Sequence, residues 1–175
     1  MKRVQYYRYG GPEVLRLEEF ALDAPGRGEI RVGVRAAAAN PMDWKIRSGE
    51  MKMMTSQKFP RGLGHDFAGV VDAVGPNVTR FKVGDEVFGA TGLREAGTFA
   101  EALVTEDKTV FLKPQSLSFQ EAAALPIVSA AAWTALIDKA KLRAGQQVFI
   151  TGCLGGAHVF SVLFGQARGT VRWIR

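Results

Sequence analysis

Residues 146 to 156 read QQVFITGCLGG, a short apolar run followed by a glycine-rich turn. This order is typical of the start of a dinucleotide-binding βαβ unit, where a buried strand leads into a turn that lets backbone N–H groups approach a phosphate. Such a unit takes about 30 residues, and 19 residues follow Gly156 in this sequence of 175. We therefore predict a truncated α/β Rossmann-type segment, with 146–151 as a buried strand and 157–168 as the next helix.

The sequence before this segment has the pattern of a β-rich domain. Short stretches of alternating apolar residues are bounded by Gly, Pro and Asp; they cover 1–9, 13–22, 29–39, 65–75, 81–89, 98–106 and 109–114. Many short strands at regular spacing favour a closed or nearly closed β-barrel. Gly69 lies inside one predicted strand, which indicates a bulge or a close approach of two backbones.

Helix signals are fewer and come mainly after Pro114. Asn40-Pro41 and Ser48-Gly49 bound one short helix in the first part of the chain. Ser118 and Glu121 have the spacing of a capping box, so a helix should begin there. Pro126 interrupts it, and 127–139 form an alanine-rich second helix. We predict a substrate domain over 1–122, and linking helices with a partial dinucleotide-binding domain over 123–175.

Composition limits the functions to consider. The formal net charge of +6 is scattered, with no run of five like charges, so a nucleic-acid-binding or scaffolding barrel is an alternative supported by net charge alone. A single cysteine, Cys153, excludes an internal disulfide and fits a reducing compartment. The N-terminus has no signal-peptide pattern, and no apolar stretch reaches membrane-spanning length. These features predict a cytoplasmic protein.

Six ordered stretches resemble the medium-chain dehydrogenase/reductase superfamily, most closely its zinc-free quinone oxidoreductase branch. They are AAAANPMDWKIRSG (36–49), GLGHDFAGVVDAVG (62–75), VTRFKVGDEVFG (78–89), AGTFAEALV (96–104), LSFQEAAALP (117–126) and RAGQQVFITGCLGG (143–156). The resemblance implies a mainly β GroES-like barrel joined to a Rossmann domain, with the active site in the cleft between them. It also implies a small-molecule substrate and allows a homo-oligomer.

The same resemblance speaks against a metal. Zinc-dependent members carry a cysteine near the position of Asn40 and a histidine before an acid in the glycine-rich strand. This chain retains the histidine and acid, as His65-Asp66, but not the cysteine. Catalytic zinc needs three protein ligands, which His65, Asp66 and Asp43 could supply. The alternative for His65 is a strand residue that is hydrogen-bonded near the mouth of the barrel. Without a metal there is no strong Lewis acid for an alkoxide. A quinone or conjugated carbonyl is the easier substrate, because its oxyanion is delocalised and hydrogen-bond donors can stabilise it.

Three residues are the predicted catalytic candidates. Asn40 leads, because its carboxamide at a strand-to-loop junction could bind a substrate carbonyl or the nicotinamide ribose; the alternative is a turn residue held by the following proline. Asp43 and Lys45 are further candidates, against the alternative of a solvated or mutually paired loop.

The predicted cofactor site is the glycine turn, formed by Gly152, Gly155, Gly156 and Ala157. The family pattern G-x-x-G-G-V-G is broken here at Ala157-His158, where the final glycine is replaced. NADPH is preferred to NAD on the resemblance. The alternative to an NAD(P)H-dependent quinone or enone reductase is a truncated, non-catalytic product that keeps the barrel and does not bind cofactor.

Overall fold

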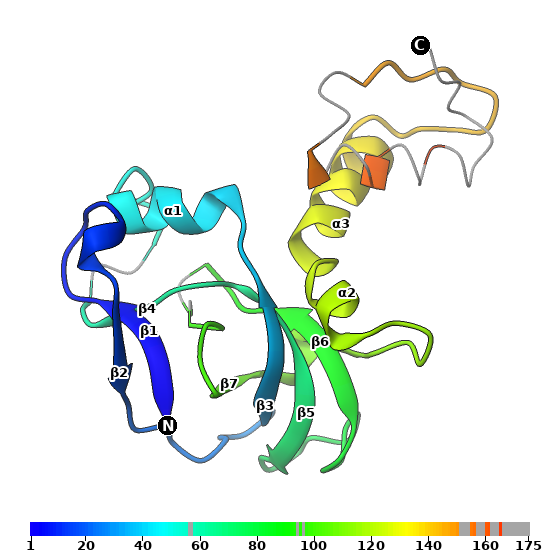
Figure 1. Ribbon diagram of the computed structural model, residues 1–175. Coiled ribbons are helices and arrows are strands. Elements are labelled where there is room, and N and C mark those ends of the chain that lie inside the picture. Colours follow the sequence, from blue (N-terminus) through cyan, green and yellow to red (C-terminus); the bar gives the residue numbers. More distant parts are fainter. Residues whose placement is uncertain are drawn as a thin grey trace. The chain divides into compact units, whose positions relative to one another are not determined.

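The computed structural model describes residues 1–55, 58–93, 95, 97–150, 155, 156, 160, 161 and 165. The chain divides into two compact units, Met1–Ala124 and Leu125–Arg175. The first unit is built mainly from strands and the second, where it is described, from helices (Figure 1). The assignment of substrate binding to 1–122 and of cofactor binding to 123–175 stays a prediction.

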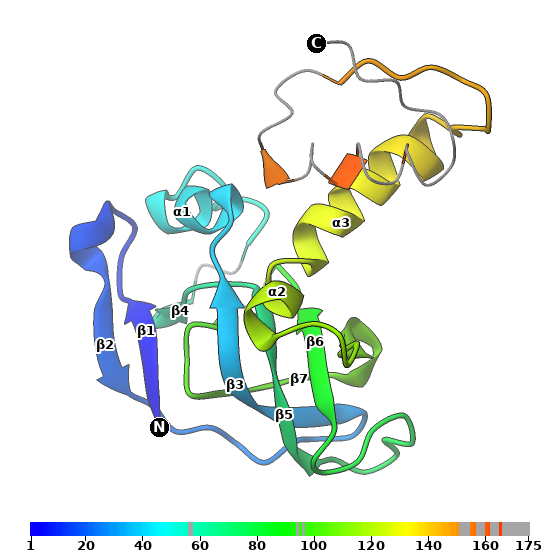
Figure 2. The same ribbon diagram turned by 45° about the vertical axis from the view of Figure 1, so that its right-hand side comes forward.

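The first unit consists of two antiparallel sheets, seen from two directions in Figures 1 and 2. The larger sheet has the order β7-β3-β5-β6-β8, with β3 Glu29–Ala38, β5 Asp66–Val74, β6 Glu86–Ala90, β7 Ala102–Glu106 and β8 Val110–Leu112. The smaller sheet has the order β2-β1-β4, with β1 Lys2–Tyr6, β2 Arg16–Glu19 and β4 Arg61–Gly62. Two 3₁₀ turns, η1 Pro12–Val14 and η2 Asp107–Thr109, connect strands. The predicted mainly β GroES-like fold is confirmed.

One segment joins the two sheets into a barrel. Glu101 donates its N–H to the carbonyl of Lys2 at 3.0 Å and accepts from the N–H of Val34 at 2.9 Å. The N–H of Val4 in turn donates to the carbonyl of Phe99 at 2.8 Å. The hydrogen bonding therefore continues from β1 of the smaller sheet to β3 of the larger one, which protects edges that would otherwise be open.

The main core lies on the inner face of the larger sheet. Ile30 and Val32 of β3 alternate with outward residues, as the sequence pattern predicts, and both are buried. The residues packed in this cluster are Ile30, Val32, Phe67, Val71, Phe81, Val87, Leu103 and Val110. Aromatic and β-branched side chains dominate it, which is how a pleated surface packs well.

Gly69 is a position of close backbone approach, as predicted. A Cβ atom built there would lie 2.8 Å from Cγ1 of Val32 and 3.0 Å from the carbonyl carbon of Gly33. The register between β3 and β5 shifts nearby, between Val34 and Ala36. A bulge of this kind bends the strand, and the bend brings the two backbones together where no side chain fits.

Both helices of the first unit begin where the sequence predicts. Helix α1 spans Pro41–Ser48 after Asn40, and Gly49 ends it with φ of 91°. Helix α2 spans Phe119–Ala123, and the hydroxyl of Ser118 accepts from the N–H of Glu121 at 3.2 Å. Ala122 and Ala123 pack α2 against Ala68 of β5. Their small side chains let the helix approach the sheet closely.

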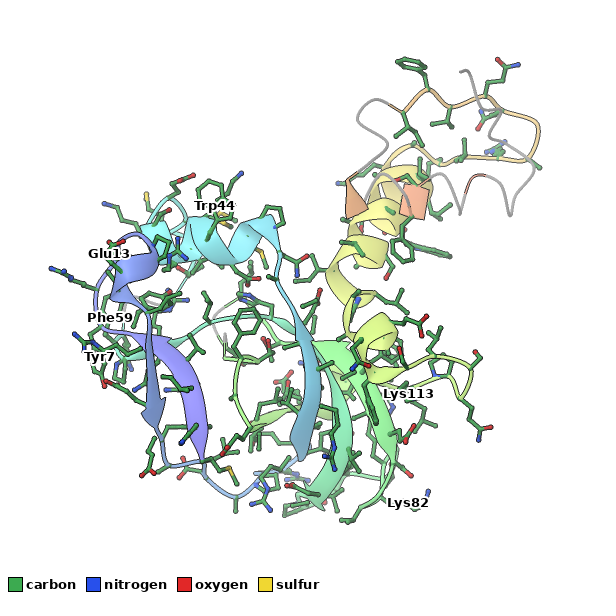
Figure 3. All side chains as sticks on the ribbon, viewed as in Figure 1. Tyr7, Glu13, Trp44, Phe59, Lys82 and Lys113 are labelled. Atoms are coloured by element: carbon green, nitrogen blue, oxygen red, sulfur yellow. The ribbon has the colours of Figure 1, made fainter. Side chains whose placement is uncertain are left out.

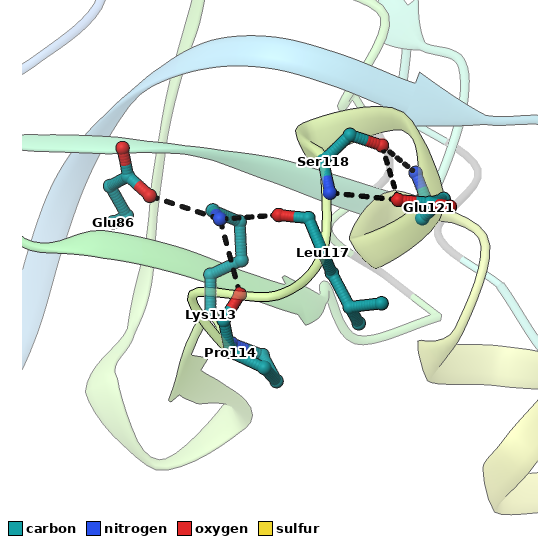
Figure 4. A network of polar contacts seen from close by, with 6 residues as sticks. All are labelled: Glu86, Lys113, Pro114, Leu117, Ser118 and Glu121. Atoms are coloured by element: carbon teal, nitrogen blue, oxygen red, sulfur yellow. Dashed lines mark hydrogen bonds and ion pairs between the residues drawn. The ribbon is translucent and has the colours of Figure 1, made fainter.

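A buried lysine fixes the connection from β8 to α2. The side chain of Lys113 is 5% exposed, and its Nζ lies 3.0 Å from Oε2 of Glu86. It also donates to the carbonyls of Leu117 at 2.6 Å and Pro114 at 3.2 Å (Figure 4). Buried charges are tolerated when they are paired and hydrogen-bonded in this way.

The second unit begins with α3 Pro126–Trp133, which continues into the π-helix η3 Thr134–Lys139. This confirms the predicted second helix. The strand predicted for 146–151 is wrong over its described part, because 146–150 have no regular structure and Phe149 is 79% exposed. A buried parallel strand exists only through its neighbours, and no described strand pairs with these residues. No helix of the described ranges is long and apolar enough to cross a membrane.

Candidate active site

The ends of three strands meet at one end of the larger sheet. Asp66, the first residue of β5, pairs with Ala38 at the end of β3 and with Ala90 at the end of β6. Just beyond, the N–H of Thr91 donates to the carbonyl of His65 at 2.9 Å. Helix α1 follows β3 directly, so its first turn lies beside this meeting point.

Asp43 links the start of α1 to β5. Its Oδ2 accepts the backbone N–H of Asn40 at 2.7 Å, and its Oδ1 lies 2.7 Å from Nδ1 of His65. Asp43 and His65 are both buried. An acidic residue at the third helical position both satisfies a free N–H and sits favourably at the positive end of the helix. Asp43 is therefore buried and paired with His65, and it holds the backbone of Asn40; it is not a solvated loop residue.

Asn40 is held by its side chain as well as by its backbone. Its Nδ2 donates to Oδ2 of Asp66 at 2.9 Å, across 26 positions in the sequence. Asn40 also precedes Pro41 and is the N-cap residue of α1. Its backbone therefore has the turn role that the sequence offered as the alternative to a catalytic one. The amide nitrogen carries two hydrogens, and the bond to Asp66 uses one of them. The amide is thus oriented and, among the residues that the structure describes, keeps one donor for a further acceptor.

His65 contributes one nitrogen to this network. Because Nδ1 faces a carboxylate, we assign a hydrogen to Nδ1, which donates to Asp43. Within the part of the chain that the structure describes, the buried Nε2 has no hydrogen-bond partner. Among those same residues, no three His, Cys, Asp or Glu side chains are arranged to hold a metal ion. The set His65, Asp66 and Asp43 forms hydrogen bonds instead.

Lys45 does not join the network. It lies on the exposed side of α1, with its Nζ 5.7 Å from the centre of the Trp44 ring. Trp44 is itself exposed on α1 (Figure 3). A lysine on a helix surface can swing its ammonium over several ångströms, so its position is less restricted than that of Asn40.

The predicted cofactor residues are described only in part. Gly152 and Ala157 lie outside the described residues, while Gly155 and Gly156 are exposed. A Cβ atom at Gly156 would lie 3.0 Å from Cγ1 of Val128 in α3, so a side chain there would crowd the helix. Of these two residues, Gly156 is the one at which a close contact with α3 leaves little room for a side chain.

Sequence reasoning missed how Asp66 takes part. It considered Asp66 only as a metal candidate and His65 as either a metal ligand or a hydrogen-bonded strand residue. In the structure His65 is hydrogen-bonded to Asp43, and Asp66 accepts a hydrogen bond from Asn40. The N-x-x-D spacing of Asn40 and Asp43 is a local signal that could have predicted their bond. The bonds to His65 and Asp66 depend on strand pairing and have no such local signal.

Residues 26–115 match the alcohol dehydrogenase GroES-like domain family. The chain belongs to the medium-chain dehydrogenase/reductase superfamily. Within it, the chain lies in the quinone oxidoreductase-like branch, as predicted. It is 36% identical over 170 residues to a quinone oxidoreductase of Sus scrofa, covering 97% of this chain and 50% of the relative.

Two further relatives widen the comparison. A 2-methylene-furan-3-one reductase of Solanum lycopersicum is 39% identical over 163 residues, covering 89% of this chain and 42% of the relative. The structure of Escherichia coli quinone oxidoreductase complexed with NADPH superposes with a TM-score of 0.85 at 28% identity, covering 98% of this chain and 51% of that one. The chain thus spans about half the length of the curated relatives that it matches.

Proposed function

We propose that this protein takes part in the reduction of a quinone or conjugated carbonyl compound with NADPH, without a metal ion. The relatives named above act on a quinone or on a conjugated furanone, and one was solved with NADPH. Both substrate classes accept a hydride and place the resulting negative charge on a conjugated oxygen. The protein's task is then to stabilise that oxygen and to orient the substrate.

The anchored amide of Asn40 is the observation that carries this proposal. Its bond to Asp66 fixes the direction of Nδ2 and leaves one N–H for a substrate oxygen. A donor oriented in advance needs no rearrangement as charge develops, which is why such donors lower the barrier. Asp43 maintains this arrangement by holding the backbone of Asn40 and the ring of His65.

Lys45 is the proposed second donor. Its ammonium is exposed and long enough to approach a charge that develops near α1. In this proposal Asn40 provides an oriented hydrogen-bond donor to the substrate oxygen, and Lys45 provides a positive charge near it. The loss of Lys45 should therefore affect activity less than the loss of Asn40.

The nicotinamide group would supply the hydride when bound. Gly155 and Gly156, together with Gly152 and Ala157 as predicted from the sequence, would hold its pyrophosphate. Within this chain, the small size of Gly156 beside Val128 supports the assignment. A preference for NADPH over NADH is part of the proposal and is measured as the ratio of the two kcat/KM values.

The first test is oxidation of NADPH by the purified protein with 1,4-benzoquinone and with a conjugated enone. Turnover should persist in EDTA, whereas a simple alcohol with NADP⁺ should give none. Activity that appears only after zinc is added would overturn the metal-free part of the proposal. Activity with alcohols alone would overturn the substrate class.

The second test concerns Asn40. We expect Asn40→Ala to lower kcat/KM for the quinone by about 10- to 100-fold, the range for one oriented donor to an oxyanion. Ser48→Ala at the other end of α1 is the matched control and should leave kcat/KM unchanged, because among the described residues the hydroxyl of Ser48 hydrogen-bonds to the carbonyl of Lys45 and to the side chain of Glu50, away from Asn40. Equal activities of the two variants would remove Asn40 from the site.

The non-catalytic alternative rests on the exposed, irregular 146–150 segment. Titrating this 175-residue chain with NADPH, followed by nucleotide fluorescence, separates the two readings. Saturation at micromolar NADPH would overturn the alternative. A flat titration, together with activity in a longer chain that contains this region, would favour it.

A further inference from the structure

A cavity in the first unit lies where β1, the chain after β2 and β7 come together. Its volume is about 80 Å³, and Arg3, Phe20, Thr91, Glu95, Gly97 and Leu103 are among the residues that line it. A cavity of about 150 Å³ holds benzene, so this one has room for roughly three or four heavy atoms. It uses none of the proposed catalytic residues Asn40, Asp43 and Lys45.

Arg3 presents a positive charge to this cavity. Its Nε and Nη2 both donate to Oε1 of Gln5, at 3.2 and 2.7 Å, and its guanidinium stacks on Phe20 at 4.6 Å. A guanidinium has five N–H groups, so three remain after these two bonds. No carboxylate of the described residues forms an ion pair with it. Burial lowers the pKa of Arg3, because desolvation disfavours the charged form.

Thr91 adds a hydroxyl that lacks a partner. The residue is 8% exposed, and among the described residues its Oγ1 has no hydrogen bond. A buried hydroxyl without a partner is unfavourable. A 120° rotation about χ1 moves the hydroxyl to the place of the methyl group or of the hydrogen on Cβ, and from a new staggered position it could donate to an acceptor in the cavity.

We propose that this cavity binds a small planar oxyanion, such as formate or acetate. The planar guanidinium edge left free by Gln5 matches two oxygens of such an anion, and the Thr91 hydroxyl supplies a further donor. The exposed carboxylate of Glu95 opposes the anion and keeps the affinity low.

The experiment is a titration with sodium formate at constant ionic strength, chloride being the replaced ion. NMR would follow the Nε–H of Arg3 and the amide of Thr91 in the whole chain. We expect saturable shifts with a dissociation constant on the order of 1 mM, as suits a ligand of so few atoms. Formamide, which is planar and neutral, should bind at least tenfold more weakly.

Variants separate the site from general effects of charge. Thr91→Val should weaken formate binding about tenfold, the effect of one hydrogen bond to a charged group. Thr98→Val is the matched control, because Thr98 also has a buried hydroxyl without a described partner but does not line the cavity. Glu95→Gln, at an exposed position that does not endanger folding, should tighten binding at least twofold. Unchanged binding in Thr91→Val, equal binding of formamide, or no saturation by about 100 mM formate would each overturn the proposal.

Discussion

Phe67 in the first unit and Phe149 in the second unit differ strongly in how far their side chains are buried. Phe67 in β5 is 0% exposed within the main core, whereas Phe149 in the second unit is 79% exposed. Both lie in apolar stretches that read as strands in the sequence. Only Phe67 has neighbouring strands on both sides, β3 and β6, to complete its ladder and cover its ring. An apolar run therefore becomes a buried strand only where other strands are present to pair with it.

The largest expected effect comes from making one substitution in both regions. Phe67→Ala should destabilise the first unit by about 3–5 kcal/mol, because it removes a fully buried ring and leaves a cavity. Phe149→Ala should change stability by less than about 0.5 kcal/mol. Urea unfolding followed by circular dichroism measures both. Similar losses would show that Phe149 is buried, and the contrast between the units would fail.

Two glycines in the barrel give a comparison within the first unit, between a crowded and an open backbone position. Gly69→Ala should cost about 2–4 kcal/mol, because the new methyl group would meet the backbone of Gly33, which cannot move aside. Gly33→Ala is the matched control on the facing strand. Its nearest atom would be the carbonyl oxygen of Val70 at 3.7 Å, an ordinary contact. The free energy of unfolding should separate the two variants clearly, and a larger loss in Gly33→Ala would contradict the predicted close approach.

The next smaller effect on stability is expected from replacing a buried lysine, Lys113, and comparing it with the exposed Lys82. Lys113→Met should cost about 2–3 kcal/mol, because three polar groups lose a charged donor whose side chain is 5% exposed. Lys82→Met should change little, since the side chain of Lys82 is 83% exposed although it pairs with Asp85 (Figure 3). Thermal unfolding at one pH compares them. Equal melting temperatures would mean that the network in Figure 4 adds no stability.

The smallest effect concerns pH. The hydrogen bond from the Ser118 hydroxyl, followed by that from the Ser118 backbone, lowers the pKa of Glu121. A carboxylate whose pKa is lower in the folded state stabilises the fold above its unfolded pKa, and this contribution disappears as the pH falls through the folded value. Glu121→Gln should therefore lower the melting temperature slightly at neutral pH and not at about pH 3, below the usual glutamate value. Ser118→Ala should reduce the same pH dependence. A loss in Glu121→Gln that is as large at about pH 3 as at neutral pH would argue against a stabilising role of the ionised Glu121 in the cap.

Local sequence signals correctly predicted the starts of α1, α2 and α3 and the end of α1 at Gly49. Asn40-Pro41, Ser118 with Glu121, and Pro126 each act within one turn of helix, so their effect is readable from adjacent residues. The alternation of Ile30 and Val32 likewise indicated the inner face of β3. The six ordered stretches indicated the family, and with it the barrel.

The sequence by itself determined where strands and helices can begin, which face of β3 is apolar, and that Asn40 and Asp43 stand at a helix start. Only the tertiary structure decided that His65 and Asp66 hold these two residues, that Lys113 is buried, and that 146–150 are not a strand. The reason is physical. Caps and alternation depend on neighbours a few residues apart, whereas strand pairing, burial of a charge and the assembly of a site depend on contacts between residues that are distant in the chain.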